Sequence, residues 1–290
     1  MVGLELSDAF YHFELPRLLL SIAVGAVLAL TGVMTQSLFH NPLAEPGVLG
    51  ISSGASLVTL LGLMVLPLSW HQPLWVAGLT LLGALLVSAA LLWVWQRYTL
   101  PTVNLLLIGV LVNALCGGFI QILTLLMDGE MVRGWLFWSA GQLGNASWGQ
   151  VGWLMLLAVS GGWILWKKST ALDALLLGDA IAYSLGVEPR RFQRGLLAGA
   201  AVLVASTLAV CGQVGFVGLM APHLARAWCG GNHKRLIPNA MIIGAVLVAL
   251  ADWGCQHLIE GGELPVGSLT TLMGVPVLLH ALIRHHRSRY

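Results

Sequence analysis

The chain has 290 residues, of which 58% are hydrophobic and only 9% are charged, with a formal net charge of +2. Because about a quarter of the residues of soluble domains are charged, this composition excludes an ordinary water-soluble protein, and the long apolar runs exclude a disordered or nucleic-acid-binding chain. We therefore expect a single all-α domain over residues 1–290 that crosses a membrane several times and is surrounded by lipid.

Apolar segments long enough to cross a bilayer recur along the chain. A hydrocarbon core of about 30 Å requires about 20 apolar residues in a helix. The segments that meet this length are 18–39, 47–67, 73–96, 102–126, 148–166, 236–258 and 265–283. A longer apolar stretch, 195–228, is interrupted near Gly212, Gly215 and Gly218, so that it forms either one long crossing or a hairpin of two shorter ones.

The distribution of lysine and arginine distinguishes these alternatives, because cytoplasmic loops are enriched in both residues. With a hairpin, the chain has nine crossings, and all its lysines and arginines except Arg17 and Arg133 lie on the side of the C-terminus, which we assign to the cytoplasm. A single crossing would place the basic clusters at 167–194 and 226–235 on opposite sides. We therefore expect nine transmembrane helices, with the N-terminus outside and no signal peptide.

The longest cytoplasmic segment, 167–194, is also the most polar part of the chain. It contains Asp173 and Asp179 among leucines and alanines. Four apolar side chains are predicted to share one face of a short amphipathic helix pair: Leu172, Leu175, Leu176 and Ile181. Such a pair either lies on the membrane surface or docks a cytoplasmic partner, and the pattern alone does not separate these interpretations.

A catalytic site has little support in the sequence. Residues 50–54 have the G-x-S-x-G spacing of a serine-hydrolase elbow, but that elbow requires a preceding strand. An intramembrane protease would use Ser52 or Ser53 as nucleophile and His223 as base. Small residues at the start of a membrane helix more often serve packing, so we expect no catalytic residue. The four cysteines are scattered and are expected to be buried thiols, without a disulfide or a metal.

Three further features concern transport. Glu45 lies in a short cytoplasmic turn with two prolines, where we expect it to be solvated. The glycine-rich stretch 212–218 is typical of a helix broken beside a transport pathway. Asp252 is the one acid deep inside an apolar segment, with no evident charged partner, and indicates either a pathway residue or a polar contact near the interface. A single acid makes a coupling-ion site unexpected, so the energy for transport is expected from a partner at the inner docking segment.

Five motifs occur in a specific order. They are LPR at 15–17, QSLFHNPLAEPGVLGISSGA at 36–55, LGD at 177–179 with Ala182 and SLG at 184–186, GFVGL at 215–219 with Pro222, His223 and Arg226, and ELPVG at 263–267 with GVP at 274–276. On these motifs the chain resembles, over nearly its whole length, the FecCD-type permeases. These are the membrane subunits of bacterial ATP-binding-cassette importers for iron–siderophores, haem and cobalamin.

The resemblance implies a fold of ten transmembrane helices per subunit in the bacterial inner (cytoplasmic) membrane. Two such subunits surround a central pathway and bind a cytoplasmic ATPase dimer, and a periplasmic binding protein delivers the substrate. The chain itself then has no enzymatic centre, no cofactor and no metal.

The resemblance also assigns roles to residues. The segment that matches the family's coupling helices is 172–187, which favours docking over a position on the membrane surface. Contact with the ATPase is implied for Leu177, Gly178, Asp179, Ala182, Leu185 and Gly186. The segment that matches the pathway-lining helix is 102–126, and the final helix begins near the channel. Candidate lining residues are Asn113, Gly117, Gly118 and Pro265.

The chain departs from the family pattern in two respects. The family begins with an additional helix, so that either this first helix is absent or the start of the sequence is displaced. The family's surface for the binding protein is basic, and Arg17 fits that role. Three residues earlier, where a relative often carries an arginine, this chain has Glu14, and after Asp252 it has Gln256. The outer face is acidic, which disfavours docking through a pair of salt bridges; its acids are Glu5, Asp8, Glu14, Asp128, Glu130, Glu260 and Glu263.

We therefore expect the permease subunit of an importer for a metal chelate, in particular an iron–siderophore. Haem and cobalamin are the alternatives within the family, and a heterodimer with a related permease is the alternative to a homodimer. Outside the family, the alternatives are the intramembrane protease and a secondary transporter, which would work on an ion gradient without an ATPase.

Overall fold

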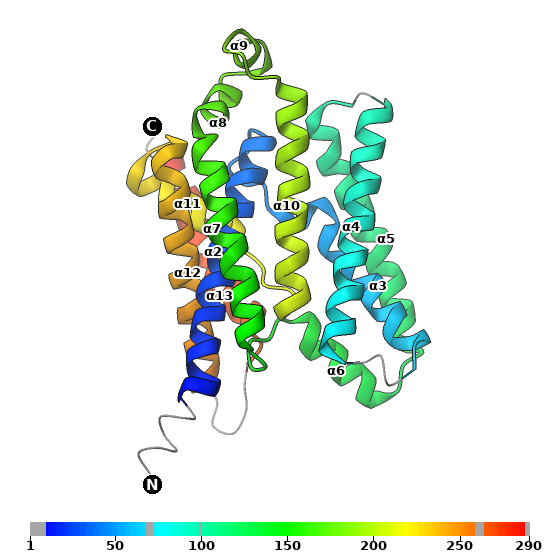
Figure 1. The fold of residues 1–290 in the computed structure, drawn as a ribbon. Coiled ribbons are helices and arrows are strands. Elements are labelled where there is room, and N and C mark those ends of the chain that lie inside the picture. The colour runs from blue at the N-terminus through cyan, green and yellow to red at the C-terminus, as the bar shows by residue number, and fades with distance from the viewer. Residues whose placement is uncertain (1–9, 68–71, 99, 259–263, 288–290) are drawn as a thin grey trace.

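The computed structural model describes residues 10–67, 72–98, 100–258 and 264–287, and this part of the chain is helical without strands (Figure 1). The predicted all-α class is therefore confirmed. In the described residues, six helices are long and apolar enough to cross a membrane. They are α2 (Leu15–Leu38), α4 (Pro73–Tyr98), α5 (Thr102–Leu125), α7 (Trp148–Lys167), α10 (Pro189–Cys211) and α12 (His233–His257).

The other helices are η1 (Phe10–Glu14), η2 (Pro46–Leu49), α3 (Ile51–Val65), α6 (Gly129–Ser139), α8 (Ser169–Leu176), α9 (Asp179–Ser184), α11 (Val217–Cys229) and α13 (Val266–Arg287). The long stretch 195–228 is divided, because α10 ends before Gly212 and α11 begins only after Phe216. Figure 1 shows α8 and α9 at the end of the molecule opposite the N-terminus, and we call this end the inner end.

Local sequence explains where several helices begin. The side chain of Ser147 accepts a hydrogen bond from the backbone of Gln150, and the Gln150 side chain accepts one from the backbone of Ser147, which forms a capping box at the start of α7. The Asn232 side chain caps α12 in a similar way. Gly212, with φ of 71°, ends α10 in a conformation that favours glycine.

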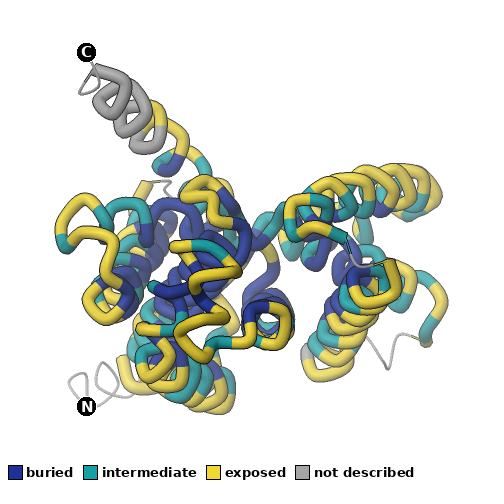
Figure 2. The backbone as a smooth tube through the Cα atoms, turned by 90° about the horizontal axis from the view of Figure 1, so that it is seen from above, coloured by how far each residue is buried: buried dark blue, intermediate teal, exposed yellow. Residues whose placement is uncertain are grey.

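Helix α2 is buried along most of its length, and Figure 2 shows such buried backbone at the centre of the larger group of helices. It packs against α7, α10, α11 and α12, and α10 also packs against α4, which in turn packs against α3. Helix α10 therefore joins the central helices to a second group formed by α3, α4 and α5. A Cβ atom added at Gly32 of α2 would clash with the Gly218 carbonyl of α11, so glycine at this position lets the two backbones meet.

Some sequence predictions fall outside the described residues. They include the outer acids Glu5, Asp8, Glu260 and Glu263 and the last arginine, Arg289. Three of the four cysteines, Cys116, Cys211 and Cys255, are buried as the scattered pattern predicts, and Cys229 is only partly buried.

Candidate functional site

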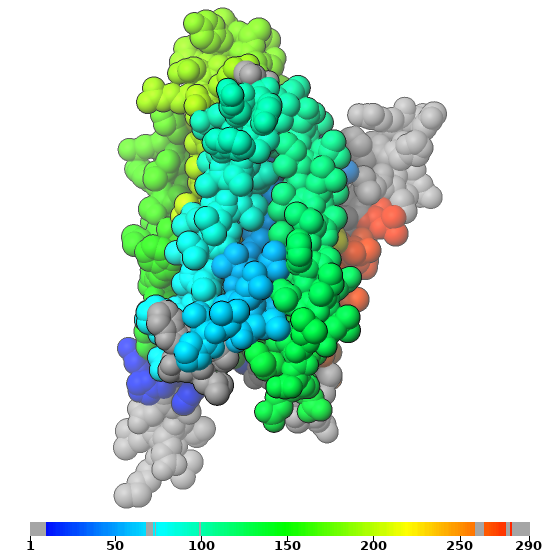
Figure 3. Space-filling model, turned by 90° about the vertical axis from the view of Figure 1, so that its right-hand side faces the viewer, coloured from blue at the N-terminus to red at the C-terminus, as the bar shows by residue number. Residues whose placement is uncertain are grey.

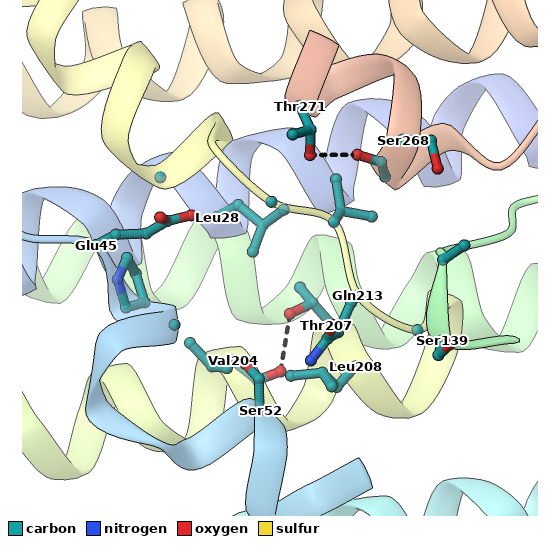
Figure 4. Close-up of a pocket in the computed structure, with 18 of the residues that line it drawn as sticks. Leu28, Glu45, Ser52, Ser139, Val204, Thr207, Leu208, Gln213, Ser268 and Thr271 are labelled. Atoms are coloured by element: carbon teal, nitrogen blue, oxygen red, sulfur yellow. Dashed lines mark hydrogen bonds between the residues drawn. The ribbon is translucent and has the colours of Figure 1, made fainter. Parts of the chain in front are cut away.

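A cavity of about 750 Å³ lies among α2, α3, α10 and α13 (Figure 4). The residues that line it are mainly glycines, hydroxyl side chains and small apolar side chains, and they include Ser52, Thr207, Ser268 and Thr271. Of the described residues in this lining, Glu45 has the one charged side chain. The volume lies within the range of small-molecule sites, so the cavity has room for a compact organic ligand.

The sequence predicts that Glu45 is solvated, but the structure places it in the cavity wall. Its Oε1 accepts a hydrogen bond from the backbone N–H of Phe216, at 2.8 Å. Phe216 has a left-handed backbone, with φ of 64°, and directly precedes α11. A carboxylate in this position compensates for the unpaired N–H groups and the partial positive charge at a helix N-terminus. Glu45 therefore fixes the point at which the broken α10–α11 segment resumes its helix.

Asn113, a candidate lining residue, does lie in the cavity wall. Its Nδ2 donates to the carbonyl groups of Gly47 and Val48, at 3.1 and 3.3 Å, and its Oδ1 accepts from the Ser53 hydroxyl, at 2.7 Å. Asn113 thus fastens η2 and the start of α3 to α5. The Ser53 hydroxyl, considered above as a nucleophile, is directed toward Asn113 and the Gly50 carbonyl.

The other three candidate lining residues lie apart from this cavity. Gly117 and Gly118 are further along α5, and an added Cβ atom would meet nothing within 4 Å at either position. Pro265 directly precedes α13, and its carbonyl group accepts hydrogen bonds from Ser268 and Leu269. The lining from this part of the chain is instead the first turns of α13, beginning at Gly267.

Three chain segments cross beside the cavity. The N–H group of Gln142 donates to the carbonyl group of the last residue of α10, at 2.8 Å, and the N–H group of the first residue of α13 donates to Gly141, at 3.0 Å. A Cβ atom added at Gly141 or at Gly267 would clash with the same carbonyl oxygen, that of Gln213. The two glycines therefore allow the α6–α7 loop, the end of α10 and the start of α13 to meet backbone to backbone.

Helices α8 and α9 form the predicted amphipathic pair, but its four apolar side chains do not share one face. Leu172 and Leu175 are fully buried against the core, whereas Leu176 and Ile181 are each 46% exposed. Leu176 is the last residue of α8, and Ile181 belongs to a separate helix beyond Gly178, which has φ of 104°. A helical period does not continue through such a turn.

The tip of this pair, which we call the α8–α9 tip, contains the residues predicted to contact an ATPase. Leu177 and Leu185 are 62% and 63% exposed, and Asp179 is exposed and accepts a hydrogen bond from Gln193. Ala182 is fully buried, and Gly178 and Gly186 both have positive φ angles, so these three shape the tip.

A series of polar contacts joins α8 to the transmembrane helices, with Asp173 partly exposed and His233 and Ser37 buried. Asp173 Oδ1 lies 2.6 Å from His233 Nδ1, and His233 Nε2 lies 2.9 Å from the Ser37 hydroxyl. The backbone N–H of His233 also donates to Asp173, at 3.1 Å, and His40 Nε2 lies 2.7 Å from the Leu175 carbonyl oxygen. Helix α8 is thereby tied to the start of α12 and the end of α2.

Ser37, His233 and Asp173 are connected in the order of a serine–histidine–aspartate triad, but the serine hydroxyl group is not accessible to a substrate. Ser37 is 1% exposed and His233 is fully buried, so no substrate reaches the hydroxyl group. Ser37 also lies 2.7 Å from the Val33 carbonyl oxygen, to which it donates within α2. The arrangement therefore serves to join helices.

Asp252 has a charged partner, contrary to the sequence prediction. Arg17 Nη2 lies 2.9 Å from Asp252 Oδ1, and Arg17 Nε donates to both carboxylate oxygens. The Gln256 side chain donates to Oδ2, at 2.9 Å. The Arg17 and Asp252 side chains are 12% and 4% exposed, so this pair joins the outer ends of α2 and α12 in a largely dry environment. The two residues are 235 positions apart, which is why no local pattern reveals the pair.

Comparison with known proteins places this architecture among transport proteins. The model of the FecCD transport family matches residues 5–284. The chain is 38% identical to the hemin transport system permease protein HmuU of Yersinia pestis, an alignment that covers 98% of this chain and 86% of that protein. It is 36% identical to the vitamin B12 import system permease protein BtuC of Vibrio cholerae, over 96% of this chain and 83% of that protein.

A solved structure shows the same architecture. It is described as an inward-facing conformation of a metal-chelate type ABC transporter, and it superposes on this chain with a TM-score of 0.87 at 29% sequence identity. The match covers 96% of this chain and 88% of the solved chain.

Proposed function

The chain belongs to the FecCD transport family and is a multi-pass ABC importer permease, and from this premise we propose that its substrate is a metal chelate, in particular an iron–siderophore. The observation that carries the proposal is the cavity of about 750 Å³, whose wall is mostly neutral and rich in glycine backbone and hydroxyl groups. Such a wall contacts a polar chelate without holding it firmly, which a transport pathway requires because the substrate must also leave. The alternative substrates are hemin and vitamin B12, which appear in the names of the two relatives.

The energy for transport comes from an ATPase partner, which membership of the family implies. We propose that this ATPase docks on the α8–α9 tip, through the exposed Leu177, Asp179 and Leu185. The Asp173–His233–Ser37 contacts support this site, because they give α8 a stiff attachment to α2 and α12. Movement of the ATPase would then tilt these helices as a rigid body.

A second permease copy is also implied by the family, and we propose a homodimer formed along α5. Only 17% of the apolar window of this helix is buried in the single chain. Figure 3 shows α5 at the surface of this side of the molecule, between α3 and α13. Large apolar side chains cover its exposed face: Val103, Leu107, Val110, Leu111, Leu115, Phe119 and Ile122. Since Asn113 of the same helix lies in the cavity wall, a partner on α5 would enclose the pathway between the two copies, with Gly117, Gly118 and Pro265 beside it.

A periplasmic binding protein would deliver the substrate at the outer ends of α2 and α12. Arg17 remains the proposed docking residue there, although Asp252 already binds its guanidinium group. An acid of the binding protein would compete with Asp252 for Arg17. Docking would then loosen the contact between α2 and α12.

Transport in proteoliposomes tests the class and the substrate together. The permease, reconstituted with its partner ATPase and binding protein, is expected to take up an iron–siderophore only when ATP is supplied. Uptake driven by an ion gradient without the ATPase would contradict the proposal and favour a secondary transporter. Uptake of hemin or vitamin B12 in place of the siderophore would leave the class intact and change the substrate.

Docking of the ATPase is tested at the α8–α9 tip. We expect Leu177→Asp and Leu185→Asp to abolish copurification of the ATPase with the permease while the permease still inserts in the membrane. Tyr98→Asp is the matched control, since Tyr98 is 63% exposed at the end of α4, away from the tip. Equal loss of the ATPase from all three variants, or from none, would contradict the proposed docking surface.

A further inference from the structure

Two tryptophans and two lysines form an ordered surface cluster where α7 ends and α12 begins, which we call the Trp–Lys cluster. The rings of Trp163 and Trp166 are stacked, with centroids 5.5 Å apart and planes at 19°. Lys167 Nζ lies 4.9 Å from the centroid of Trp163, and Lys234 Nζ lies 5.5 Å from that of Trp166. The Trp166 Nε1–H group donates to the Lys234 carbonyl oxygen, at 3.1 Å, which joins the two helices. Each ammonium group is thus held on one ring of a stacked pair.

The Trp–Lys cluster lies at the inner boundary of the membrane-spanning helices. Figure 1 shows the end of α7 running into α8, at the end of the molecule that also contains α9. Trp163 is 56% exposed, and both lysines are exposed. Indole rings concentrate at the headgroup level of a bilayer, and lysine side chains extend from that level toward the aqueous phase. The cluster therefore has the composition and the position of residues that meet lipid headgroups.

The charged residues of the cluster and their charged sequence neighbours are all basic. Lys168 and Arg235, both exposed, adjoin its two lysines in the sequence. Asp173, an acid of the adjoining α8, is engaged by His233. Fixed cations that lie close together repel one another, and an anion bound between them relieves that repulsion.

An apolar surface continues from the cluster along α7. Leu156, Val159 and Trp163 follow one another at helical spacing and are all exposed, by 61%, 69% and 56%. A ligand that suits both parts has a phosphate group for the ammonium groups and hydrocarbon for this face.

We propose that the Trp–Lys cluster binds the phosphate group of an anionic phospholipid of the inner leaflet, with an acyl chain along the exposed face of α7. Lys167 and Lys234 donate to the phosphate oxygens, and the stacked rings hold both ammonium groups in place. This site does not depend on the transported substrate or on the ATPase. Basic residues near anionic lipid each contribute enough to change the affinity roughly five-fold.

Lipid titration of the purified permease tests the proposal. Native mass spectrometry is expected to show phosphatidylglycerol retained in preference to phosphatidylcholine. The double variant Lys167→Gln/Lys234→Gln is expected to lower the phosphatidylglycerol affinity roughly 25-fold, since two cations are lost. Arg97→Gln is the matched control, because Arg97 is an exposed cation at the end of α4 toward the inner end of the molecule. Equal loss per removed charge in the double variant and in the control would show attraction by overall charge and would overturn the proposal.

Two further arms identify the ligand chemistry. Trp163→Leu retains every charge and an apolar side chain but removes the ring beneath Lys167. We expect this variant to weaken phosphatidylglycerol binding. Trp153→Leu, at a similarly exposed position of α7, is the control and should leave binding unchanged. Inorganic phosphate alone is expected to leave the thermal unfolding temperature unchanged. Stabilisation by phosphate equal to that by the lipid would assign the site to a free anion and overturn the proposal. Because none of these measurements involves transport, their failure would leave the proposed function untouched.

Discussion

Helices α2 and α5 have the same length and the same hydropathy, but opposite positions in the molecule. The apolar window of each has a mean hydropathy of 2.2, yet 83% of that window is buried in the segment that contains α2 and 17% in α5. Hydropathy therefore identifies a helix that enters a membrane without indicating which neighbours it has there. A bilayer interior and a protein interior are both apolar, so an average over side chains does not separate them.

Small and polar side chains distinguish the two helices. Helix α2 buries Gly25, Gly32 and five polar side chains that have hydrogen-bond partners: Ser21, Thr31, Thr35, Gln36 and Ser37. Helix α5 instead directs large aliphatic side chains outward, and its fully buried positions are few. A buried hydroxyl group that bonds to its own helix costs little, and it leaves room for a neighbouring helix to approach.

The largest expected effect comes from adding bulk to one glycine of each helix. Gly32→Val should abolish recovery of folded permease, because the side chain would enter the Gly218 backbone of α11. Gly117→Val in α5 should fold normally, since nothing lies within 4 Å of its added Cβ. Size-exclusion chromatography and thermal unfolding in detergent measure both. Similar recovery of the two variants would remove the distinction between the central and the outer helix.

Removing the Asp252 carboxylate, which binds Arg17 at the outer end of α2, should have the next largest effect on stability. Asp252→Ala leaves Arg17 without its partner at a site where the two side chains are 12% and 4% exposed. Breaking a buried pair in this way lowers the free energy of unfolding by about 3–5 kcal/mol. The double variant Arg17→Met/Asp252→Leu should recover most of that loss in chemical unfolding experiments, because no uncompensated charge remains. A double variant as unstable as the single one would contradict the ion-pair explanation.

At the inner end of α2, His233→Ala should separate ATP hydrolysis from transport. The substitution removes the contacts of His233 with Asp173 and Ser37, and we expect about 2 kcal/mol of lost stability from the hydrogen bonds to a charged group. It also weakens the attachment of α8 to α2 and α12, so the amount of substrate carried per ATP hydrolysed should fall. The control is Asn239→Ala, which removes a local hydrogen bond on α12, the helix that also contains His233. Equal decreases in hydrolysis and transport would indicate a structural role only.

The smallest effect on folding is expected on the outward face of α5. Leu111→Asn should change the free energy of unfolding of the single chain by less than about 0.5 kcal/mol, because Leu111 is 61% exposed. The same variant should weaken the dimer in analytical ultracentrifugation. Leu156→Asn on α7, also at 61% exposure, should not affect the dimer. Dissociation by both variants would place the dimer contact elsewhere than α5.

These two helices also show what can be predicted from sequence. Apolar length located both, and the glycines at 212–218 predicted the break between α10 and α11, because a break in a helix is a local property. The partners of α2 and of the turn that follows it were not predictable in this way. Arg17 meets Asp252 across 235 positions, Glu45 meets Phe216 across 171, and Ser37 meets His233 across 196. Each pairing depends on how helices are placed in three dimensions, and hydropathy does not contain that information.

The backbone crossing at Gly141, Gln142 and the start of α13 has a consequence for biosynthesis. Its hydrogen bonds join residues 142 and 211 and residues 266 and 141, so the crossing cannot close before residue 266 has left the ribosome. Helices α7, α10 and α12 therefore enter the membrane while the wall beside the cavity is still open. We therefore expect this wall to close only after the start of α13 has been synthesised.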